Sequence, residues 1–243
     1  MNTSYKPAIH FHEVDYGVED ASILSKITGS FPKGRITTLV GPSGAGKTTL
    51  LKLCNGLISP QAGEIYIQGK NINEFAPVEL RKSVGMALQS APMVAGTVMN
   101  NLGLPLEIRG EKLSEEDGIN LLHDVGLNED VLNKKVKDLS GGQRQKVSIA
   151  RTLVNRPDIL LLDEITSSLD VTSLKEIEEL IVKINQKYGT TIIWITHNLQ
   201  QALTIGNYTW VMMKGKVIET GESELLESPV NEQVRRFVKG ETE

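Results

Sequence analysis

The sequence has little cysteine and no long hydrophobic run, and both absences limit what the protein can be. Cys54 is the single cysteine among 243 residues, which excludes an internal disulfide and a metal site built from a cysteine cluster. The longest apolar runs, "ILLL" and "TTIIWI", are far shorter than the ~20 residues of a membrane-spanning helix. The first residues, "MNTSYKPAIHFHEVDY", lack the apolar core of a signal peptide. We therefore expect a soluble, cytoplasmic chain that reaches a membrane only through a partner.

The sequence also lacks an excess of either charge. Its 26 basic and 30 acidic side chains give a net charge of −4, which offers no electrostatic support for a nucleic-acid partner. Hydrophobic residues make up 40% of the chain and charged residues 23%, as is usual for soluble globular proteins. A chain of this length and composition can bury a substantial core. We expect a globular protein that binds no nucleic acid.

Strand and helix patterns alternate along most of the chain. Apolar patterns predict strands at residues 8–16, 35–40, 63–69, 84–89, 159–162 and 191–195, and a hairpin over residues 208–221. Helical patterns cover residues 47–57 and 174–188, and three more lie within residues 91–154, at 98–102, 114–125 and 142–154. Because strands that alternate with helices of this length form parallel sheets, the sequence predicts an α/β fold with a helical insertion.

A glycine-rich segment joins the strand at 35–40 to the helix that follows. "GPSGAGKT", residues 41–48, fits the pattern G-x-x-x-x-G-K-[ST] and is called the phosphate loop below. Backbone amides at the positive end of a helix bind anions, Lys47 would bridge two phosphates, and the Thr48 hydroxyl would bind Mg²⁺. A turn that only caps the helix is the alternative, but strand, loop and helix together favour ATP or GTP binding. The predicted nucleotide-binding residues here are Gly41, Pro42, Ser43, Gly44, Ala45, Gly46, Lys47, Thr48 and Thr49.

Two carboxylates follow the apolar strand "ILLL" directly. Successive side chains of a strand point to opposite sides, so Asp163 and Glu164 cannot do the same work. Ligands of open α/β sheets bind at the carboxyl edge of the sheet, where one acid can reach Mg²⁺ and the other an attacking water. We assign Asp163 to the metal and Glu164 to the water as general base. A solvated strand end is the alternative.

A second glycine motif, "LSGGQ", occupies residues 139–143 and begins a helix. Ser140 followed three positions later by Gln143 fits a capping box, which explains half of the motif. It does not explain Gly141 and Gly142, since each glycine costs roughly 0.8–1.0 kcal/mol against alanine in a helix interior. Glycine permits close approach of a phosphate to the exposed amides of a helix start. The motif therefore predicts a second phosphate site, with the Ser140 hydroxyl and the Gly142 amide as donors.

These motifs stand in the order found in one protein family. "GPSGAGKTT", Gln89, "LSGGQ", "ILLLDE", "SSLD" and "ITH" together resemble the nucleotide-binding subunit of ATP-binding-cassette (ABC) transporters. The resemblance implies a P-loop NTPase fold: α/β, with a mainly parallel sheet core, an antiparallel β subdomain and an inserted helical subdomain. It implies a single ABC ATPase domain over residues 1–243, with the core at 1–88 and 155–243. The helical subdomain, at 89–154, carries the LSGGQ motif.

The same resemblance implies that two chains share their ATP. In this family two cassettes pair head to tail and close two ATP molecules between the phosphate loop of one chain and the LSGGQ motif of the other. Ser140, Gly141, Gly142 and Gln143 would then serve the partner's ATP. The implied cofactors are ATP and Mg²⁺, and the implied partners are a second cassette and an integral membrane permease.

Four further positions take roles from the resemblance. Tyr16 lies where the family has an aromatic that stacks on adenine, although a tyrosine at the edge of the core is the alternative. Gln89 would touch Mg²⁺ and relay to the membrane subunit. His197 matches the histidine that contacts the γ-phosphate and orders the attacking water, so that Glu164, His197 and Lys47 are the catalytic candidates. Asp170 belongs to the loop that crosses the dimer interface, and it also fits an N-cap.

The function implied is that of an ATPase that drives a transporter through a separate membrane subunit, peripheral on the inner face of the membrane. Within the family, "LLLDEITSSLD", "LISPQAGEI" and "TVMNNLGLPLEIRG" are most similar to the ATPase of a bacterial two-component exporter implicated in iron or metal homeostasis. Amino-acid and phosphate importers are somewhat less similar. A soluble ABC ATPase acting on ribosomes or DNA is a further alternative, and the LSGGQ motif opposes a P-loop kinase or GTPase.

Overall fold

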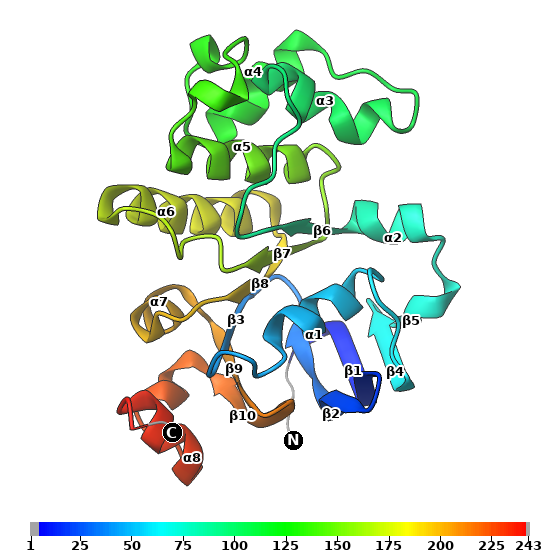
Figure 1. Ribbon diagram of the computed structural model, residues 1–243, viewed down its shortest axis with the longest axis vertical. Coiled ribbons are helices and arrows are strands. Elements are labelled where there is room, and N and C mark those ends of the chain that lie inside the picture. Colours follow the sequence, from blue (N-terminus) through cyan, green and yellow to red (C-terminus); the bar gives the residue numbers. More distant parts are fainter. Residues whose placement is uncertain (1–4, 242–243) are drawn as a thin grey trace.

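The central part of the molecule is a six-stranded sheet, mostly parallel, in a computed structural model that describes residues 5–241 (Figure 1). Its strand order is β10-β9-β3-β8-β7-β6, and β10 alone of these six pairs antiparallel. The strands are β3 (Ile36–Val40), β6 (Val84–Ala87), β7 (Ile159–Asp163), β8 (Thr191–Ile195), β9 (Tyr208–Met213) and β10 (Lys216–Glu222). Every residue of β3, β7 and β8 is buried, because helices cover both faces of a parallel sheet. The predicted α/β fold with a parallel core is confirmed.

A second sheet, antiparallel, packs beside the first. Its order is β2-β1-β4-β5, formed by β1 (Pro7–Val18), β2 (Ala21–Pro32), β4 (Ala62–Ile67) and β5 (Lys70–Asn71). An aromatic cluster joins the two sheets: the rings of Phe31 and Trp210 lie 4.5 Å apart, and Phe11 lies 5.8 Å from Trp210. Such pairs stabilise a core beyond their buried area alone. The antiparallel sheet therefore shares its core with the sheet that carries the phosphate loop.

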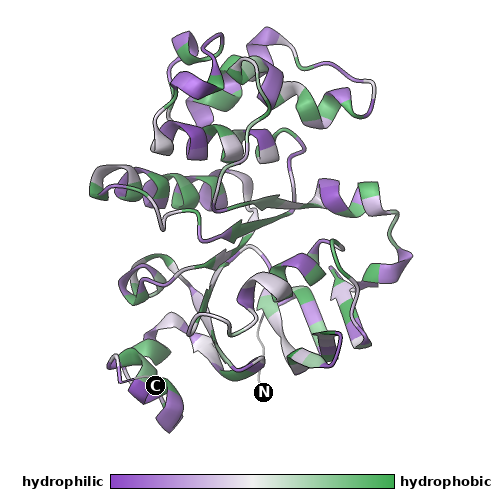
Figure 2. Cartoon of the chain, in the orientation of Figure 1, coloured by the Kyte–Doolittle hydropathy of each residue, from purple (hydrophilic) through white to green (hydrophobic). Residues whose placement is uncertain are grey.

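Helices cover the parallel sheet and form a separate layer above it. The core helices are α1 (Lys47–Cys54), α2 (Pro77–Ser83), α6 (Val171–Tyr188), α7 (Leu199–Ile205) and α8 (Glu232–Val238). The layer at the top of Figure 1 contains α3 (Val98–Glu107), α4 (Glu115–Asp124) and α5 (Gly141–Leu153). Short 3₁₀ turns occur at η1 (Ile72–Glu74), η2 (Glu129–Val131), η3 (Val136–Asp138) and η4 (Ser223–Leu226). Figure 2 shows hydrophobic residues along the central strands, and between residues 5 and 241 no helix is long and apolar enough to cross a membrane.

Several boundaries differ from the sequence prediction. Helix α1 ends at Cys54 and not at residue 57, because Gly56 takes a left-handed conformation (φ 65°). Helix α6 begins at Val171, three residues before the predicted start, since Asp170 caps it. Strand β2 was not predicted; its pairing with β1 shifts register at several points, and this interrupts the alternation that a sequence pattern depends on.

Candidate active site

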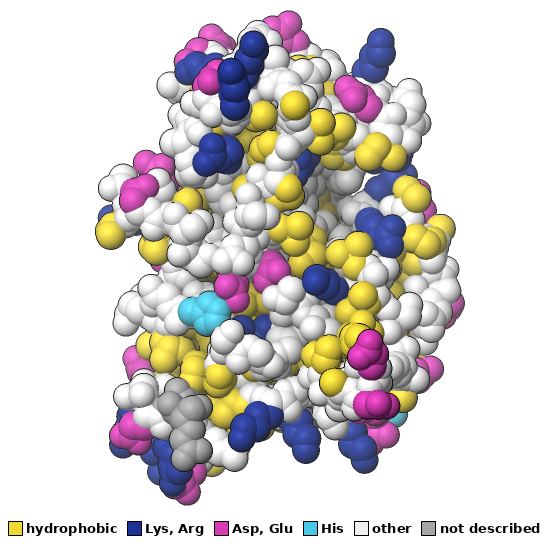
Figure 3. Space-filling view, viewed as in Figure 1, with side chains coloured by type: hydrophobic (Ala, Val, Ile, Leu, Met, Phe, Trp, Pro, Cys, Tyr) yellow, Lys and Arg dark blue, Asp and Glu magenta, His cyan; other side chains and the backbone are white. Residues whose placement is uncertain are grey.

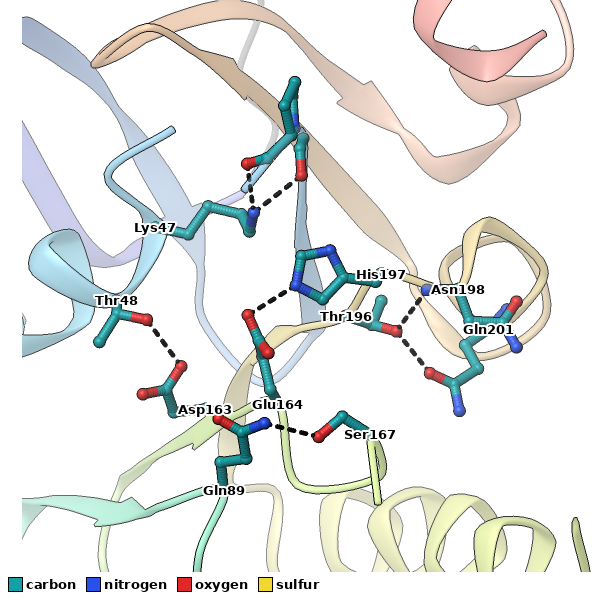
Figure 4. Close-up of polar contacts among 12 residues, drawn as sticks. Lys47, Thr48, Gln89, Asp163, Glu164, Ser167, Thr196, His197, Asn198 and Gln201 are labelled. Atoms are coloured by element: carbon teal, nitrogen blue, oxygen red, sulfur yellow. Dashed lines mark hydrogen bonds and ion pairs between the residues drawn. The ribbon is translucent and has the colours of Figure 1, made fainter. Parts of the chain in front are cut away.

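The carboxyl ends of four parallel strands bring the predicted residues to one edge of the sheet. The phosphate loop follows β3, Gln89 lies just after β6, Asp163 ends β7, and His197 follows β8. Figure 4 shows their side chains together at this edge, which is where open α/β sheets bind ligands. In the space-filling view of Figure 3, acidic, basic and histidine side chains gather near the middle of the face.

Close backbone packing fixes the shape of the phosphate loop. A Cβ atom at Gly41 (φ 144°) would lie 1.9 Å from the carbonyl oxygen of Met212, and one at Gly46 (φ 92°) would lie 2.6 Å from a methyl of Leu24. Neither position admits another residue. At Gly44 (φ 77°), by contrast, nothing lies within 4 Å of such an atom. The loop therefore rests on β9 and β2 and leaves open space at its tip.

The loop presents a set of donors without protein acceptors. In the part of the chain that the structure describes, the amides of Gly44, Gly46, Lys47 and Thr48 donate to no other residue. The ammonium group of Lys47 donates to the carbonyls of Gly41 (2.8 Å) and Pro42 (2.9 Å), and the side chain is buried. Burial lowers the pKa of Lys47, although the carboxylates of Glu164 and Asp163 act in the opposite sense. A cradle of free amides around a buried cation fits the phosphates of a nucleotide.

Thr48 and Asp163 form the polar contact expected of a metal site. The Thr48 hydroxyl donates to Oδ1 of Asp163 at 2.9 Å. Burial raises the pKa of Asp163, the Thr48 hydrogen bond lowers it, and the neighbouring Glu164 raises it again, with a net increase. Nearby, the Gln89 amide nitrogen donates to the Ser167 hydroxyl at 2.9 Å. The side-chain oxygens of Thr48, Asp163 and Gln89 are suitable ligands for Mg²⁺, which usually binds one or two protein groups plus the phosphates of its substrate. Residues 5–241 contain no group of three or more His, Cys, Asp or Glu side chains that could hold a metal alone.

Glu164 turns away from Asp163 and toward His197. Strand β7 ends at Asp163, and Glu164 takes a left-handed conformation (φ 49°) that is uncommon outside glycine. Its Oε1 atom lies 2.7 Å from Nε2 of His197 (Figure 4). The strained backbone thus separates the two consecutive carboxylates, one toward Thr48 and the other toward the histidine.

The LSGGQ motif forms the predicted capping box at the start of α5. The Gln143 amide donates to the Ser140 hydroxyl at 3.2 Å, and the Ser140 amide donates to Oε1 of Gln143 at 3.0 Å. Gly142 packs against α6, where Ser173 also bonds Asp170, the N-cap of that helix. No hydrogen bond among the described residues joins residues 140–143 to the phosphate loop. The structure thus places the two glycine motifs in separate parts of one chain, and the capping alternative holds for both Ser140 and Asp170.

Tyr16 lies within β1, which continues beyond it to Val18. It is half-buried, packs against the main core and pairs across the sheet with Leu24, the residue whose methyl touches the Gly46 position. The tyrosine is therefore on the strand pair that supports the phosphate loop. Its proposed stacking on adenine stays a prediction.

Sequence patterns gave no role to a group of polar side chains behind the site, although two of them, Ser167 and Thr196, stand in the motifs "SSLD" and "ITH". Ser167 accepts the bond from Gln89, and Thr166, Thr196 and Gln201 form a buried network next to Glu164 and His197. The first three lie within three residues of the predicted catalytic groups, and that proximity was the available signal. Gln201 gives no such signal, since a glutamine in a helix is ordinarily exposed.

Comparison with known proteins agrees with this geometry. Residues 24–167 match the protein family described as "ABC transporter". The chain is 41% identical over 241 residues to the "Putative ABC transporter ATP-binding protein YjkB" of Bacillus subtilis, with 97% of this chain and 96% of that protein covered.

Solved structures give the same answer. Cassette cbiO1 of Clostridium perfringens, part of the ABC transporter complex cbiONQ, has a TM-score of 0.83 at 28% identity, covering 96% of this chain and 98% of cbiO1. The dimeric, post-hydrolysis ATP-binding cassette MJ0796, bound to ADP and Pi, has a TM-score of 0.78 at 30% identity, covering 88% and 98% respectively. The P-loop NTPase fold of the ABC type is thereby confirmed. The chain belongs to the ABC transporter family, as an ATP-binding subunit with ATPase activity.

Proposed function

We propose that the chain hydrolyses MgATP at a head-to-tail dimer interface and drives transport through a separate membrane subunit. The observation that carries the hydrolytic part is the pair formed by Glu164 and His197, at the same sheet edge as the phosphate loop. In this proposal the chain is one domain: residues 1–88 and 155–243 form the nucleotide-binding core, and residues 89–154 form the helical subdomain.

Each group has a role that its position supports. Lys47 and the free amides of the phosphate loop hold the phosphates, and Tyr16 stacks on the base. Thr48, Asp163 and Gln89 would hold Mg²⁺, which would neutralise charge on the phosphoryl group being transferred. Glu164 accepts the proton of the attacking water, and His197 fixes the carboxylate of Glu164 and orients that water.

The LSGGQ motif serves the ATP of a partner cassette. Ser140, Gly141, Gly142 and Gln143 lie at a helix start that is separate from the chain's own phosphate loop, and Ser140 and Gly141 are exposed. The Asp170 loop lies beside them through Ser173. The structural relative MJ0796 is dimeric with ADP and Pi bound, which supports a pair of this kind.

A membrane permease is the second partner. Exposed apolar side chains at Leu57, Val78, Leu88 and Val94 lie on segments next to α1, α2 and Gln89, and in Figure 3 hydrophobic side chains are visible between the α3–α5 layer and the antiparallel sheet. The relative cbiO1 is part of a transporter complex. Docking here would place the chain on the inner face of the membrane.

The first experiment is a tagged pull-down from native membranes solubilised in mild detergent, with mass spectrometry of the co-purifying proteins. The expected result is a multispanning membrane protein, lost in Val94→Lys but retained in Val230→Lys, a matched change at a position that is 86% exposed near α8. Recovery only from the soluble fraction, with ribosomes or nucleic acid, would overturn the transporter role and leave the ATPase chemistry standing.

The proposed cargo is a metal ion, exported, on the basis of the segment similarity to iron and metal exporters. The test uses the purified complex in vesicles with the ATPase subunits outside and Fe²⁺ as the probe. ATP-driven accumulation of Fe²⁺ by the wild type, but not by Glu164→Gln, is expected. ATP hydrolysis stimulated by amino acids or phosphate, with no metal movement, would contradict the metal assignment.

A further inference from the structure

A buried glutamine connects the loops that carry Glu164 and His197. Gln201 lies on α7 and is only 2% exposed. Its Oε1 atom accepts a hydrogen bond from the Thr196 hydroxyl at 2.5 Å, and its amide nitrogen donates to the Thr166 hydroxyl at 3.4 Å. Thr196 immediately precedes His197, and Thr166 follows Glu164 by two residues. One side chain thus bonds to both loops from behind.

The helix that carries Gln201 is tied to the same histidine loop. Oδ1 of Asn198 accepts from the amides of Gln200 (2.9 Å) and Gln201 (3.3 Å) and so caps α7. The Asn198 amide in turn donates to the Thr196 hydroxyl at 3.0 Å (Figure 4). Both neighbours of His197 in sequence are therefore fixed relative to Gln201.

Few contacts hold the side chain of His197 itself in place. Its side chain is 47% exposed, and its one hydrogen bond in the described part of the chain is the 2.7 Å contact with Glu164. A ring that packing does not hold depends on its backbone for orientation. A displacement of that backbone by about 1 Å can reduce a rate about 100-fold when the geometry of reacting groups depends on it.

We propose that Gln201 is a positioning residue for ATP hydrolysis: it ties the loop of His197 to the loop of Glu164 and keeps their side chains within hydrogen-bond distance. The inference rests on the proposed roles of these two residues in hydrolysis. Among the described residues the Gln201 side chain makes no hydrogen bond to the phosphate loop or to the LSGGQ motif, so it affects turnover and leaves ATP binding unchanged.

The test is Gln201→Met, which keeps the length and volume of the side chain and removes both hydrogen bonds. The matched control is Gln200→Met, at the exposed neighbouring glutamine, whose side chain makes no hydrogen bond among the described residues. In steady-state assays with ATP we expect kcat to fall about 10- to 100-fold in Gln201→Met, with KM within about twofold of the wild type. Gln200→Met keeps the wild-type kcat.

A double-variant cycle separates positioning from general stabilisation. If Gln201 acts through His197, adding Gln201→Met to His197→Ala lowers kcat by at most about twofold further, whereas independent effects multiply. Equal losses in the two backgrounds, or an unchanged kcat in folded Gln201→Met, would overturn the proposal. Should Gln201→Met unfold, Thr166→Val removes one of the two bonds and no other side-chain hydrogen bond among the described residues, and it is expected to lower kcat in the same direction. Failure of the proposed function itself would show separately, as full hydrolysis by Glu164→Gln.

Discussion

A Cβ atom built at Gly142 lies 2.7 Å from the hydroxyl oxygen of Ser173 and 3.0 Å from its Cβ. Helices α5 and α6 approach so closely at this point that any side chain at residue 142 would press against Ser173. At Gly141, one residue earlier, the nearest atom is a methyl of Leu169 at 3.9 Å, an ordinary contact. The two adjacent glycines of the LSGGQ motif therefore have different causes: packing within the chain requires the second, and nothing in the fold requires the first.

Alanine at each position separates these causes. Gly142→Ala should lower the free energy of unfolding by about 1–3 kcal/mol through overpacking, and Ser173→Gly in the same chain should restore part of that loss. Gly141→Ala should leave the fold as stable as the wild type or slightly more so, since the position is helical and has room. Urea unfolding measures both. ATPase activity should fall in Gly141→Ala if the motif contacts the partner's ATP, and a fully active Gly141→Ala would contradict that contact.

Glu164→Gln should abolish turnover and leave ATP binding intact. The amide retains a polar contact with His197 but cannot accept the proton of water, a loss worth about 10²–10⁴-fold in rate. ATP then persists, and the ATP-bound dimer accumulates. Phosphate release, nucleotide affinity and size-exclusion chromatography measure the three effects. Glu179→Gln, on the exposed side of α6, is the matched control. Normal ATP hydrolysis by Glu164→Gln would contradict the assignment of Glu164 as general base.

The sequence predicts the position of a site residue when that position is set by residues near it in the chain. Asp163 and His197 follow apolar strands, so the carboxyl edge of a parallel sheet gathers them predictably. The left-handed turn at Glu164 and the packing of Gly142 on Ser173 depend on segments that meet only in the folded chain. Sequence patterns cannot predict the role of Gln201 either, because the loops after β7 and β8 bury its side chain only in the folded protein. The irregular strand β2 escaped prediction because register shifts break its alternation.

Mixed dimers test whether each ATP site draws on two chains. Lys47→Ala removes the cation of the phosphate loop, and Ser140→Arg places a bulky side chain at the opposite motif. In either homodimer both sites are damaged, whereas a mixed dimer has one site with both lesions and one with neither. Mixing the two variants should therefore restore ATPase activity. Confirmed mixed dimers with no regained activity would count against an independent shared site.

Acid should weaken a contact between the helical layer and the core. Asp124, at the end of α4, accepts hydrogen bonds from Lys187 and Tyr188 at the end of α6. Burial raises the pKa of Asp124, but these two bonds outweigh it and leave the pKa below its usual value. A carboxyl whose pKa is lower in the folded state stabilises the fold above its unfolded pKa of about 3.9, and the effect disappears as the pH falls through the folded value.

Asp124→Asn should therefore lower the free energy of unfolding by about 1 kcal/mol at pH 7, and this difference should shrink toward the acidic end of the range. Asp130→Asn, which removes an exposed i,i+4 pair with Lys134, is the control and should change stability by about 0.5 kcal/mol or less. Urea unfolding at several pH values between about 3 and 7, a range that spans most of the titration of an unfolded aspartate, compares the two variants. A constant difference across that range would exclude the titration of Asp124 as its cause.

Strand β3 leads into the phosphate loop, yet both of its neighbours, β8 and β9, come from the last quarter of the chain. In Figure 1 the blue β3 lies between strands coloured yellow to orange, and the carbonyl of Met212 on β9 supports Gly41. During synthesis the phosphate loop therefore leaves the ribosome well before β8 and β9, the strands that flank it. We therefore expect nucleotide to bind tightly only after β8 and β9 have paired with β3, so that its binding energy favours chains in which these strands are in place.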